Sequence, residues 1–354
     1  MTTPIRIGIL RLADSAPVVV AATRGIFADL DIEAQVSVEP SWANIADKLA
    51  YGLMDAAVML PPLVLASAMG LRGAPAPVIV PMGLTQGGNR IVFGRETGLV
   101  RGTSAPHLLG WLRAQPTPPR LAVVHRYSTH NLLLRYWLAL AGADPDRDVE
   151  TVVMPPTDVV QALAEGRISG FCAGPPWGEV AEQQGAGRIV TSTSSVWPSH
   201  PEKCLAVNTT WANAEPDALH RLIKALLRSL RLCDDPAEAP AIARDLAAPA
   251  WLDLPLEPTR LVLPDGSVGE RIRFHAGEVW YPARAHAQWF LGQMRRWDWI
   301  PPEVDIEQVA RQVYRADLLA RAVEEEGLYK AKCIPRLEGS ALLPMPGDNA
   351  FTPG

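Results

Sequence analysis

The chain has 354 residues, enough for one large domain or two ordinary ones with separate apolar cores. Apolar residues make up 48% of it and charged residues 20%, with a net charge of −5, which is typical of a globular protein and argues against a general nucleic-acid-binding surface. The four cysteines lie far apart and have no CxxC or Cys/His ligand spacing, so neither a zinc site nor a disulfide framework is expected.

The first ten residues, MTTPIRIGIL, lead almost directly into an alternating strand pattern. They lack the basic region, apolar run and cleavage site of a secretory signal, and no run of eighteen apolar residues follows to span a membrane. We therefore expect a cytoplasmic protein. A chain from which a signal peptide had been removed would show the same pattern.

Strand and helix patterns alternate over the first 82 residues. Strands are predicted at 6–10, 32–38, 55–60 and 78–82. Between the second and third of them lies the helical pattern WANIADKLAYG, which Ser41 is placed to cap. These repeated β-α-β units predict a parallel sheet covered by helices.

A second series of strands and helices is bracketed by two polar stretches, at 85–89 and at 191–196. The first reads as flexible, and both are interpreted as crossovers between two lobes. Lobe I is formed by residues 1–87 and 192–354, and lobe II by residues 88–191. The sequence thus predicts an α/β fold of two hinged lobes that enclose a ligand cleft. After residue 215 helices dominate, and residues 335–354 read as extended.

One helix start within lobe II has the features of an anion site. The run Ser128-Thr129-His130-Asn131 follows a strand pattern and opens an apolar helix over 130–140. Ser128 or Thr129 is the expected N-cap. Because the first turn of a helix has free N–H groups and the positive end of the helix dipole, it attracts anions.

Five residues fall near the ends of predicted strands, where residues of an interlobe cleft are expected. They are Trp42, Gln86, His130, Gly174 and Lys203. Each can donate a hydrogen bond and none is a carboxylate, which suits an anion that only accepts hydrogen bonds, with Lys203 supplying the positive charge. Taken singly, His130 also fits a helix start, Lys203 an exposed strand start, Trp42 a core position and Gln86 a hinge loop.

Signals of an enzyme are poor. The chain has no GxSxG elbow, no phosphate-binding P-loop and no GxGxxG after a strand. Asp14 and Asp55 read as isolated residues near strand ends and not as a catalytic pair. We expect a binding protein without a metal or cofactor.

Read together, these segments resemble the substrate-binding proteins of cyanobacterial-type nitrate and bicarbonate importers, and the cytoplasmic relatives of those proteins that act as nitrate/nitrite sensors. The similarity covers nearly the whole chain in order and spacing. The segments that carry it are ADSAPVVVAATRGIF (13–27), EPSWANIADKLAYGLMDAAVML (39–60), STHNLLLRYWLALAGADPDRDV (128–149), the segment 153–179 with GFCAGPPWGE, VWPSHPEKCLAVN (196–208) and VYRADLLARA (313–322).

The resemblance implies a fold like that of the periplasmic binding proteins of type II, with nitrate-binding residues at the same five positions. Lys203 stands in the region where the bicarbonate-binding branch has an acidic residue and calcium, so it favours nitrate or nitrite and argues against a metal. Pro175 departs from the pattern, because relatives usually have Glu before the Pro-Trp pair.

The resemblance, with the expected cytoplasmic location, implies a sensor that controls nitrate assimilation. Such a sensor binds an RNA-binding antiterminator protein when the anion is absent and releases it when nitrate or nitrite binds; it contacts no nucleic acid or membrane itself. One alternative is the solute-binding component of a nitrate-type ATP-driven importer, and another is a binder of another small anion or organic sulfonate. A pyrimidine synthase of thiamine biosynthesis is disfavoured, because that family relies on clustered cysteines and histidines.

Overall fold

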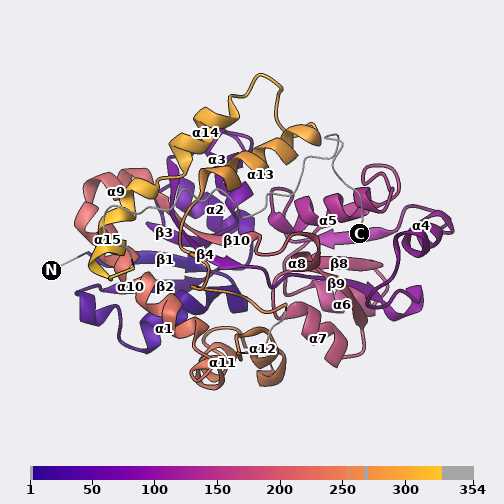
Figure 1. The fold of residues 1–354 in the computed structure, drawn as a ribbon, viewed down its shortest axis with the longest axis horizontal. Coiled ribbons are helices and arrows are strands. Elements are labelled where there is room, and N and C mark those ends of the chain that lie inside the picture. Colours follow the sequence, from indigo (N-terminus) through magenta and orange to yellow (C-terminus); the bar gives the residue numbers. More distant parts are fainter. Residues whose placement is uncertain (1–2, 254, 267–269, 329–354) are drawn as a thin grey trace.

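The computed structural model describes residues 3–253, 255–266 and 270–328. Two five-stranded sheets lie side by side, with helices packed around each (Figure 1). The first sheet belongs to lobe I and the second to lobe II. The fold is therefore α/β with two lobes, as predicted.

The sheet of lobe I has the strand order β2-β1-β3-β10-β4. Its strands are β1 (Ile5–Ile9), β2 (Ala34–Val38), β3 (Ala56–Met59), β4 (Val78–Gln86) and β10 (Pro201–Asn208). Strand β1 is parallel to β2 and β3, but β10 is antiparallel to β3 and β4. The four strands predicted in the first 82 residues are parallel to one another, since β3 and β4 both run antiparallel to β10. The sheet is mixed because β10, which returns from lobe II, lies between β3 and β4.

The sheet of lobe II has the order β7-β6-β8-β5-β9. Its strands are β5 (Arg90–Gly94), β6 (Arg120–Val123), β7 (Glu150–Val153), β8 (Gly170–Ala173) and β9 (Gly187–Ser192). Strand β6 is parallel to β7 and β8, whereas β5 is antiparallel to β8 and β9. Both sheets are mixed in the same way: the strand that breaks the parallel order is the one that arrives from the other lobe.

Helices account for most of the remaining described chain. Lobe I contains α1 (Ala16–Thr23), α2 (Trp42–Ala50), α3 (Pro61–Ala68), α9 (Thr209–Ala214), α10 (Pro216–Asp234), α11 (Ala239–Ala247), α12 (Leu256–Val262), α13 (Arg284–Arg296), α14 (Ile306–Val313) and α15 (Ala320–Glu325). Between the two sheets' ends and around the second sheet lie α4 (Ala105–Arg113), α5 (Thr129–Leu140), α6 (Val159–Ala164), α7 (Trp177–Gln183) and α8 (Thr193–Val196). Among the described helices, none has both the length and the apolar character needed to cross a bilayer.

Two helix starts that matter for the site are capped as the sequence predicts. The Ser41 hydroxyl accepts a hydrogen bond from the Asn44 amide at 3.2 Å, which fixes the start of α2. The Ser128 hydroxyl accepts one from the Asn131 amide at 3.0 Å, which fixes the start of α5. Each cap brings the first turn of its helix to the boundary between the lobes.

The polar stretch at 85–89 is not a flexible loop, and this expectation was wrong. Strand β4 continues to Gln86, and Thr85, Gln86 and Asn89 are all buried. The backbone of Gln86 also exchanges two hydrogen bonds with Arg273, at 2.9 and 3.0 Å. The backbone of Gln86 is thus paired on both edges, with Pro201 in β10 and with Arg273.

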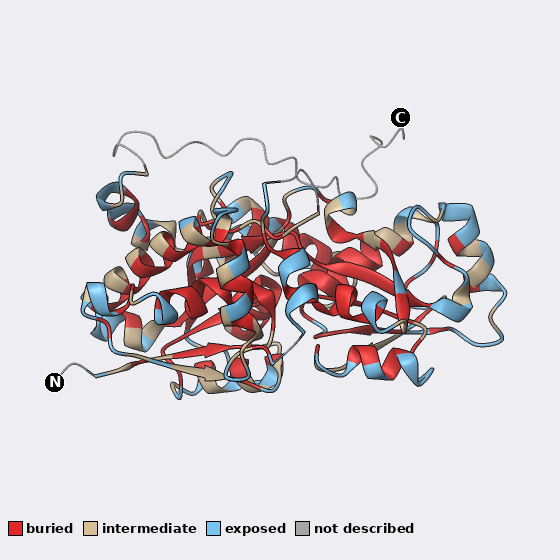
Figure 2. Cartoon of the chain, turned by 90° about the horizontal axis from the view of Figure 1, so that it is seen from below, coloured by how far each residue is buried: buried red, intermediate tan, exposed pale blue. Residues whose placement is uncertain are grey.

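Apolar contacts join the two lobes into one body. The largest buried cluster includes Leu12 and Trp42 from lobe I and Tyr127, Leu132 and Trp177 from lobe II. Figure 2 shows the buried region continuing from one sheet to the other. The lobes are therefore closed against each other.

Two further contacts bridge the lobes (Figure 1). On one side, α13 and the loop after it place three tryptophans against α5 and the turn before it. We call this set the aromatic clasp: Trp289, Trp297 and Trp299 against Tyr127, Arg135 and Tyr136. On the other side, α12 packs on α7, and the Glu270 carboxylate accepts a hydrogen bond from Arg101 of lobe II and another from Ser195 of lobe I.

Cys172, Cys204 and Cys233 are buried free thiols, as expected from their spacing. Cys333 and the segment 335–354, which was read as extended, lie outside the described residues.

Candidate functional site between the lobes

Four of the five predicted residues meet where the lobes touch. Trp42 begins α2 and Lys203 lies in β10, and the Lys203 Nζ atom is 5.7 Å from the centre of the Trp42 ring. From lobe II, His130 lies in the first turn of α5 and Gly174 follows β8. A Cβ atom at Gly174 would lie 3.1 Å from Asp14 Oδ2 and 3.5 Å from His130 Nε2, so the glycine backbone lies close to both side chains.

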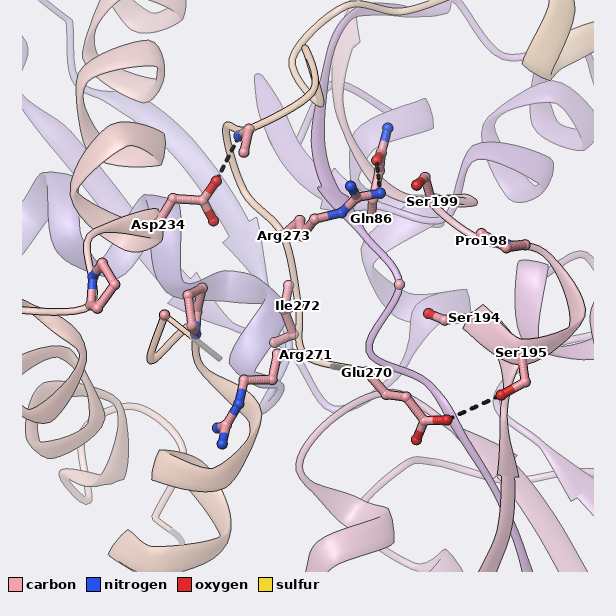
Figure 3. Close-up of a pocket in the computed structure, with 15 residues that line it drawn as sticks. Gln86, Ser194, Ser195, Pro198, Ser199, Asp234, Glu270, Arg271, Ile272 and Arg273 are labelled. Atoms are coloured by element: carbon pink, nitrogen blue, oxygen red, sulfur yellow. Dashed lines mark hydrogen bonds between the residues drawn. The ribbon is translucent and has the colours of Figure 1, made fainter. Parts of the chain in front are cut away.

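Gln86 is not part of this group. Its side-chain oxygen accepts a hydrogen bond from Arg273 Nη2 at 2.9 Å, and the residue lines a separate pocket of about 590 Å³ (Figure 3). Ser194, Ser195 and Glu270 line the same pocket. The contacts of Gln86 thus tie β4 to the segment that crosses between α12 and α13. Its role in ligand binding stays a prediction.

Asn89 is a candidate that the sequence reasoning missed. It is 0% exposed, and neither polar atom of its side chain has a hydrogen-bond partner among the described residues. The pairing of Arg90 with Ala173 places Asn89 beside Gly174. Asn89 stands only three positions after Gln86, so the two amides were not distinguishable by spacing.

Two carboxylates also lie in the site, contrary to the expectation of a purely donor set. Lys203 Nζ lies 2.7 Å from Asp14 Oδ2 and 2.7 Å from Glu202 Oε1, and all three side chains are 0% exposed. Asp14 is brought there by a short 3₁₀ turn, η1 (Ala13–Ser15), that follows β1. The Ala13 amide in this turn donates to the Pro175 carbonyl of lobe II at 2.9 Å.

Asp14 and Asp55 are not isolated, contrary to the expectation from sequence. Asp14 pairs with Lys203, and Asp55 accepts hydrogen bonds from the backbone and the guanidinium of Arg6, the latter at 3.1 Å from Nε. Both contacts join residues that are far apart in sequence. The pattern of a single strand end could not reveal them.

Burial and pairing shift the ionisation of the cluster. Burial alone lowers the pKa of Lys203, but Asp14 and Glu202 outweigh it and hold that pKa above its usual value, so the ammonium stays charged. Burial raises the pKa of Asp14 to about 6, although Lys203 opposes the shift. Burial also lowers the pKa of His130 to about 3, so its imidazole is neutral near pH 7.

Several buried polar atoms of the site are unpaired. Trp42 Nε1, Thr129 Oγ1 and both ring nitrogens of His130 have no hydrogen-bond partner within the described part of the chain, and the neutral imidazole supplies one N–H donor and one acceptor nitrogen. Leaving a buried polar group unpaired costs about 1–3 kcal/mol. The oxygens of a small anion at the start of α5 would supply the missing acceptors.

Metal coordination requires several His, Cys, Asp or Glu side chains that point to one place. Over residues 3–253, 255–266 and 270–328, no group of three or more His, Cys, Asp or Glu side chains is placed to hold a metal ion. Asp14 and Glu202 instead direct one oxygen each to Lys203.

Two α/β lobes with a buried polar site between them define the class of proteins that have the fold of the periplasmic binding proteins. Comparison with known proteins agrees. The model of the NMT1-like family matches residues 1–247, and the chain belongs to this family. The crystal structure of the periplasmic nitrate-binding protein NrtA from Synechocystis superposes with a TM-score of 0.88 at 27% identity, covering 93% of this chain and 90% of that one.

Components of importers are also similar in sequence. The nitrate import ATP-binding protein NrtC of Synechocystis sp. is 33% identical over 349 residues, covering 94% of this chain and 51% of that protein. The bicarbonate transport ATP-binding protein CmpC of Synechococcus elongatus is 32% identical over 342 residues, covering 92% of this chain and 50% of that protein. The chain thus spans about half the length of these two relatives.

Proposed function

We propose that the chain binds nitrate or nitrite between its two lobes and is not an enzyme. The observation that carries the proposal is the set of buried, unpaired donors around Lys203, contributed by Trp42 of lobe I and by Thr129 and His130 of lobe II. The similarity to a protein described as nitrate-binding, over nearly the whole chain, supports the same ligand.

The shape and charge of the ligand fit this set of groups. Nitrate and nitrite are small planar anions whose oxygens only accept hydrogen bonds, and the site offers an indole, an imidazole, a hydroxyl and an ammonium. The capped first turn of α5 adds backbone N–H groups and the positive end of its dipole. Asn89 can donate an amide N–H from the side of Gly174.

We further propose that binding serves a cytoplasmic sensor of nitrate or nitrite. In this role the ligand-free chain holds an RNA-binding antiterminator protein, and the anion releases it. The resemblance in the segments quoted above supports this role. Release requires that the anion and the partner favour different states of the chain, which a two-lobed fold provides by opening and closing.

The alternative is a solute-binding part of an ATP-driven nitrate importer, which the similarity to NrtC supports. The anion site is the same in both roles. The two roles differ in which partner protein binds the closed state of the chain. A binder of another small anion or of an organic sulfonate is a further alternative.

Isothermal titration with nitrate, nitrite, bicarbonate and sulfate tests the ligand. Saturable binding of nitrate or nitrite alone supports the proposal. Preference for bicarbonate contradicts it and points to a ligand whose own O–H donates to Asp14 or Glu202. Gel filtration of the chain with the antiterminator, with and without nitrate, tests the sensor role; a complex that nitrate does not dissociate contradicts it.

A further inference from the structure

Asp14, Glu202 and Lys203 form a charge cluster that a bound anion must enter. Both carboxylates contact the ammonium at 2.7 Å, and Glu202 also lies 3.4 Å from His130 Nε2 and 3.5 Å from His200 Nδ1. Among the described residues, these are the ionisable groups placed around Asp14: Lys203 and Glu202 from β10, and His130 from α5. The turn at Gly174 adds backbone groups only.

The charges of this cluster do not favour an anion as they stand. One ammonium and two carboxylates sum to −1, and burial keeps His130 and His200 neutral, with pKa values of about 3. Nitrate would bring the total to −2 in a place where every side chain of the cluster is 0% exposed. Uncompensated charge in such a dry environment is strongly unfavourable.

We infer that Asp14 is a further residue of the anion site and that it takes up one proton when nitrate or nitrite binds. This inference rests on the proposed function. The proton comes from solvent and bonds to a carboxylate oxygen of Asp14, and no other covalent bond changes. The new O–H donates a hydrogen bond to an oxygen of the anion. Lys203 keeps its contact with Glu202, and the N–H that had contacted Asp14 donates to the anion instead.

Geometry favours Asp14 over Glu202 as the proton acceptor. Asp14 Oδ2 lies 3.1 Å from where a Cβ atom of Gly174 would stand, so the carboxyl reaches lobe II at the site itself. Asp14 Oδ1 and Glu202 Oε2 both lack a hydrogen-bond partner in the described chain, but the Glu202 oxygens lie 3.4 Å from His130 Nε2 and 3.5 Å from His200 Nδ1. Burial holds the pKa of Asp14 at about 6, within reach of protonation near neutral pH.

The direct test measures how many protons the chain takes up when nitrate binds. The full chain is titrated with sodium nitrate at pH 7.5 in several buffers that differ in ionisation enthalpy, without phosphate. We expect the binding enthalpy to change with the buffer by an amount that corresponds to uptake of about one proton, and the dissociation constant to rise about tenfold per pH unit above pH 7. Nitrate binding without any buffer dependence overturns the inference and leaves the proposed function intact.

The variant Asp14→Asn identifies the group. It carries no titratable carboxyl, so we expect nitrate to bind with no proton uptake and with an affinity that does not change between pH 6 and pH 8. Asp158→Asn is the matched control, because Asp158 is an exposed carboxylate beside the start of α6 and should leave the proton count unchanged. Uptake of a full proton by Asp14→Asn overturns the assignment.

A measurement on the unmodified protein covers the case in which Asp14→Asn does not fold. Infrared difference spectra with and without nitrate should show a protonated carboxyl band, and labelling aspartate with ¹³C should shift this band. A band that shifts only on glutamate labelling, or no band, overturns the inference. If nitrate binds at no pH, the proposed function fails as well.

Discussion

The ring nitrogen Nε2 of His130 lies 3.4 Å from the carboxylate oxygen Oε1 of Glu202, and this distance joins the first helical turn of one lobe to a strand of the other. Both side chains are 0% exposed. A ligand bound beside His130 is therefore enclosed by both lobes, and its affinity depends on residues from each of them.

His130→Ala removes one donor from the site. We expect nitrate binding to weaken by about 1–3 kcal/mol, the usual effect of losing a hydrogen bond to a charged group. Isothermal titration measures the change. His107→Ala is the control, because His107 is an exposed residue of α4, and its affinity should equal that of the unmodified chain. Equal nitrate affinities of His130→Ala and His107→Ala would show that the anion does not bind at the start of α5.

Asn89→Ala and Gln86→Ala distinguish two amides that lie near each other in sequence. Asn89 has an unpaired amide beside Gly174, whereas the Gln86 side chain is engaged by Arg273. We expect Asn89→Ala to weaken nitrate binding by about 1–3 kcal/mol and Gln86→Ala to have a smaller effect. The reverse order, measured by titration, would restore Gln86 as the ligand-binding residue.

Lys203→Glu places three carboxylates in one buried cluster, because Asp14 and Glu202 are already there. We expect it to abolish nitrate binding and to lower the free energy of unfolding by about 3–5 kcal/mol, as for other broken buried ion pairs. This differs from the small loss of stability expected for an exposed strand-start lysine.

Urea unfolding measures the stability of this variant. Arg260→Glu is the control: Arg260 forms an exposed pair with Glu257, so its loss should cost no more than about 1 kcal/mol. Similar losses in the two variants would show that the Lys203 cluster is hydrated in solution.

Acid should destabilise the protein through its buried histidines. Burial lowers the pKa of His130 and His200 to about 3 and that of His125 and His286 to about 4, from 6.5. Below pH 6.5 the unfolded chain binds protons that the folded chain does not, so each histidine lowers the free energy of unfolding by about 1.4 kcal/mol per pH unit.

Asp14 acts in the opposite direction, because its folded pKa of about 6 lies above its ordinary value of 3.8. Its contribution to stability is present at low pH and is lost as the pH rises through about 6. Burial raises the pKa of Glu179 and Glu278 as well, but the four histidines outnumber these three carboxyls, so the net prediction is a loss of stability between pH 6.5 and pH 4. Urea unfolding at pH 7 and pH 5 checks it; equal free energies would mean that the histidines are accessible to water.

Trp297→Ala weakens the aromatic clasp. The Arg135 guanidinium lies 4.3 Å from the centre of the Trp297 ring, a contact that joins the end of α13 to α5. Since closed lobes must separate before nitrate can enter, we expect faster nitrate association than in the unmodified chain, measured by stopped-flow fluorescence. Trp111→Phe, on α4 away from the clasp, is the control. Unchanged association would show that the clasp does not limit opening.

Local patterns predicted much of the fold. Helix caps at Ser41 and Ser128 depend on neighbouring residues only, and the structure confirms both. Strand direction in β5 and β10 depends on which lobe the chain comes from, so it could not be predicted from periodicity. The sequence therefore predicted the two α/β lobes but not the antiparallel strand within each sheet.

In the site, too, residues at strand ends and helix starts could be predicted from sequence, whereas contacts between residues distant in sequence could not. His130 and Gly174 stand at the end of a strand or the start of a helix and were found by position. The pairing of Asp14 with Lys203 links residues from the two separate chain segments of lobe I, and only the assembled sheet brings them to 2.7 Å. Charge balance in the site was therefore not predictable from single motifs.

The complete burial of the Lys203 side chain affects the rate of anion exchange as well as the affinity. Its side chain and those of its two carboxylate partners are 0% exposed, so an anion exchanges only when the lobes part. Occupancy then follows the surrounding nitrate concentration no faster than the lobes open. Brief fluctuations in that concentration are therefore averaged in the occupancy of the site.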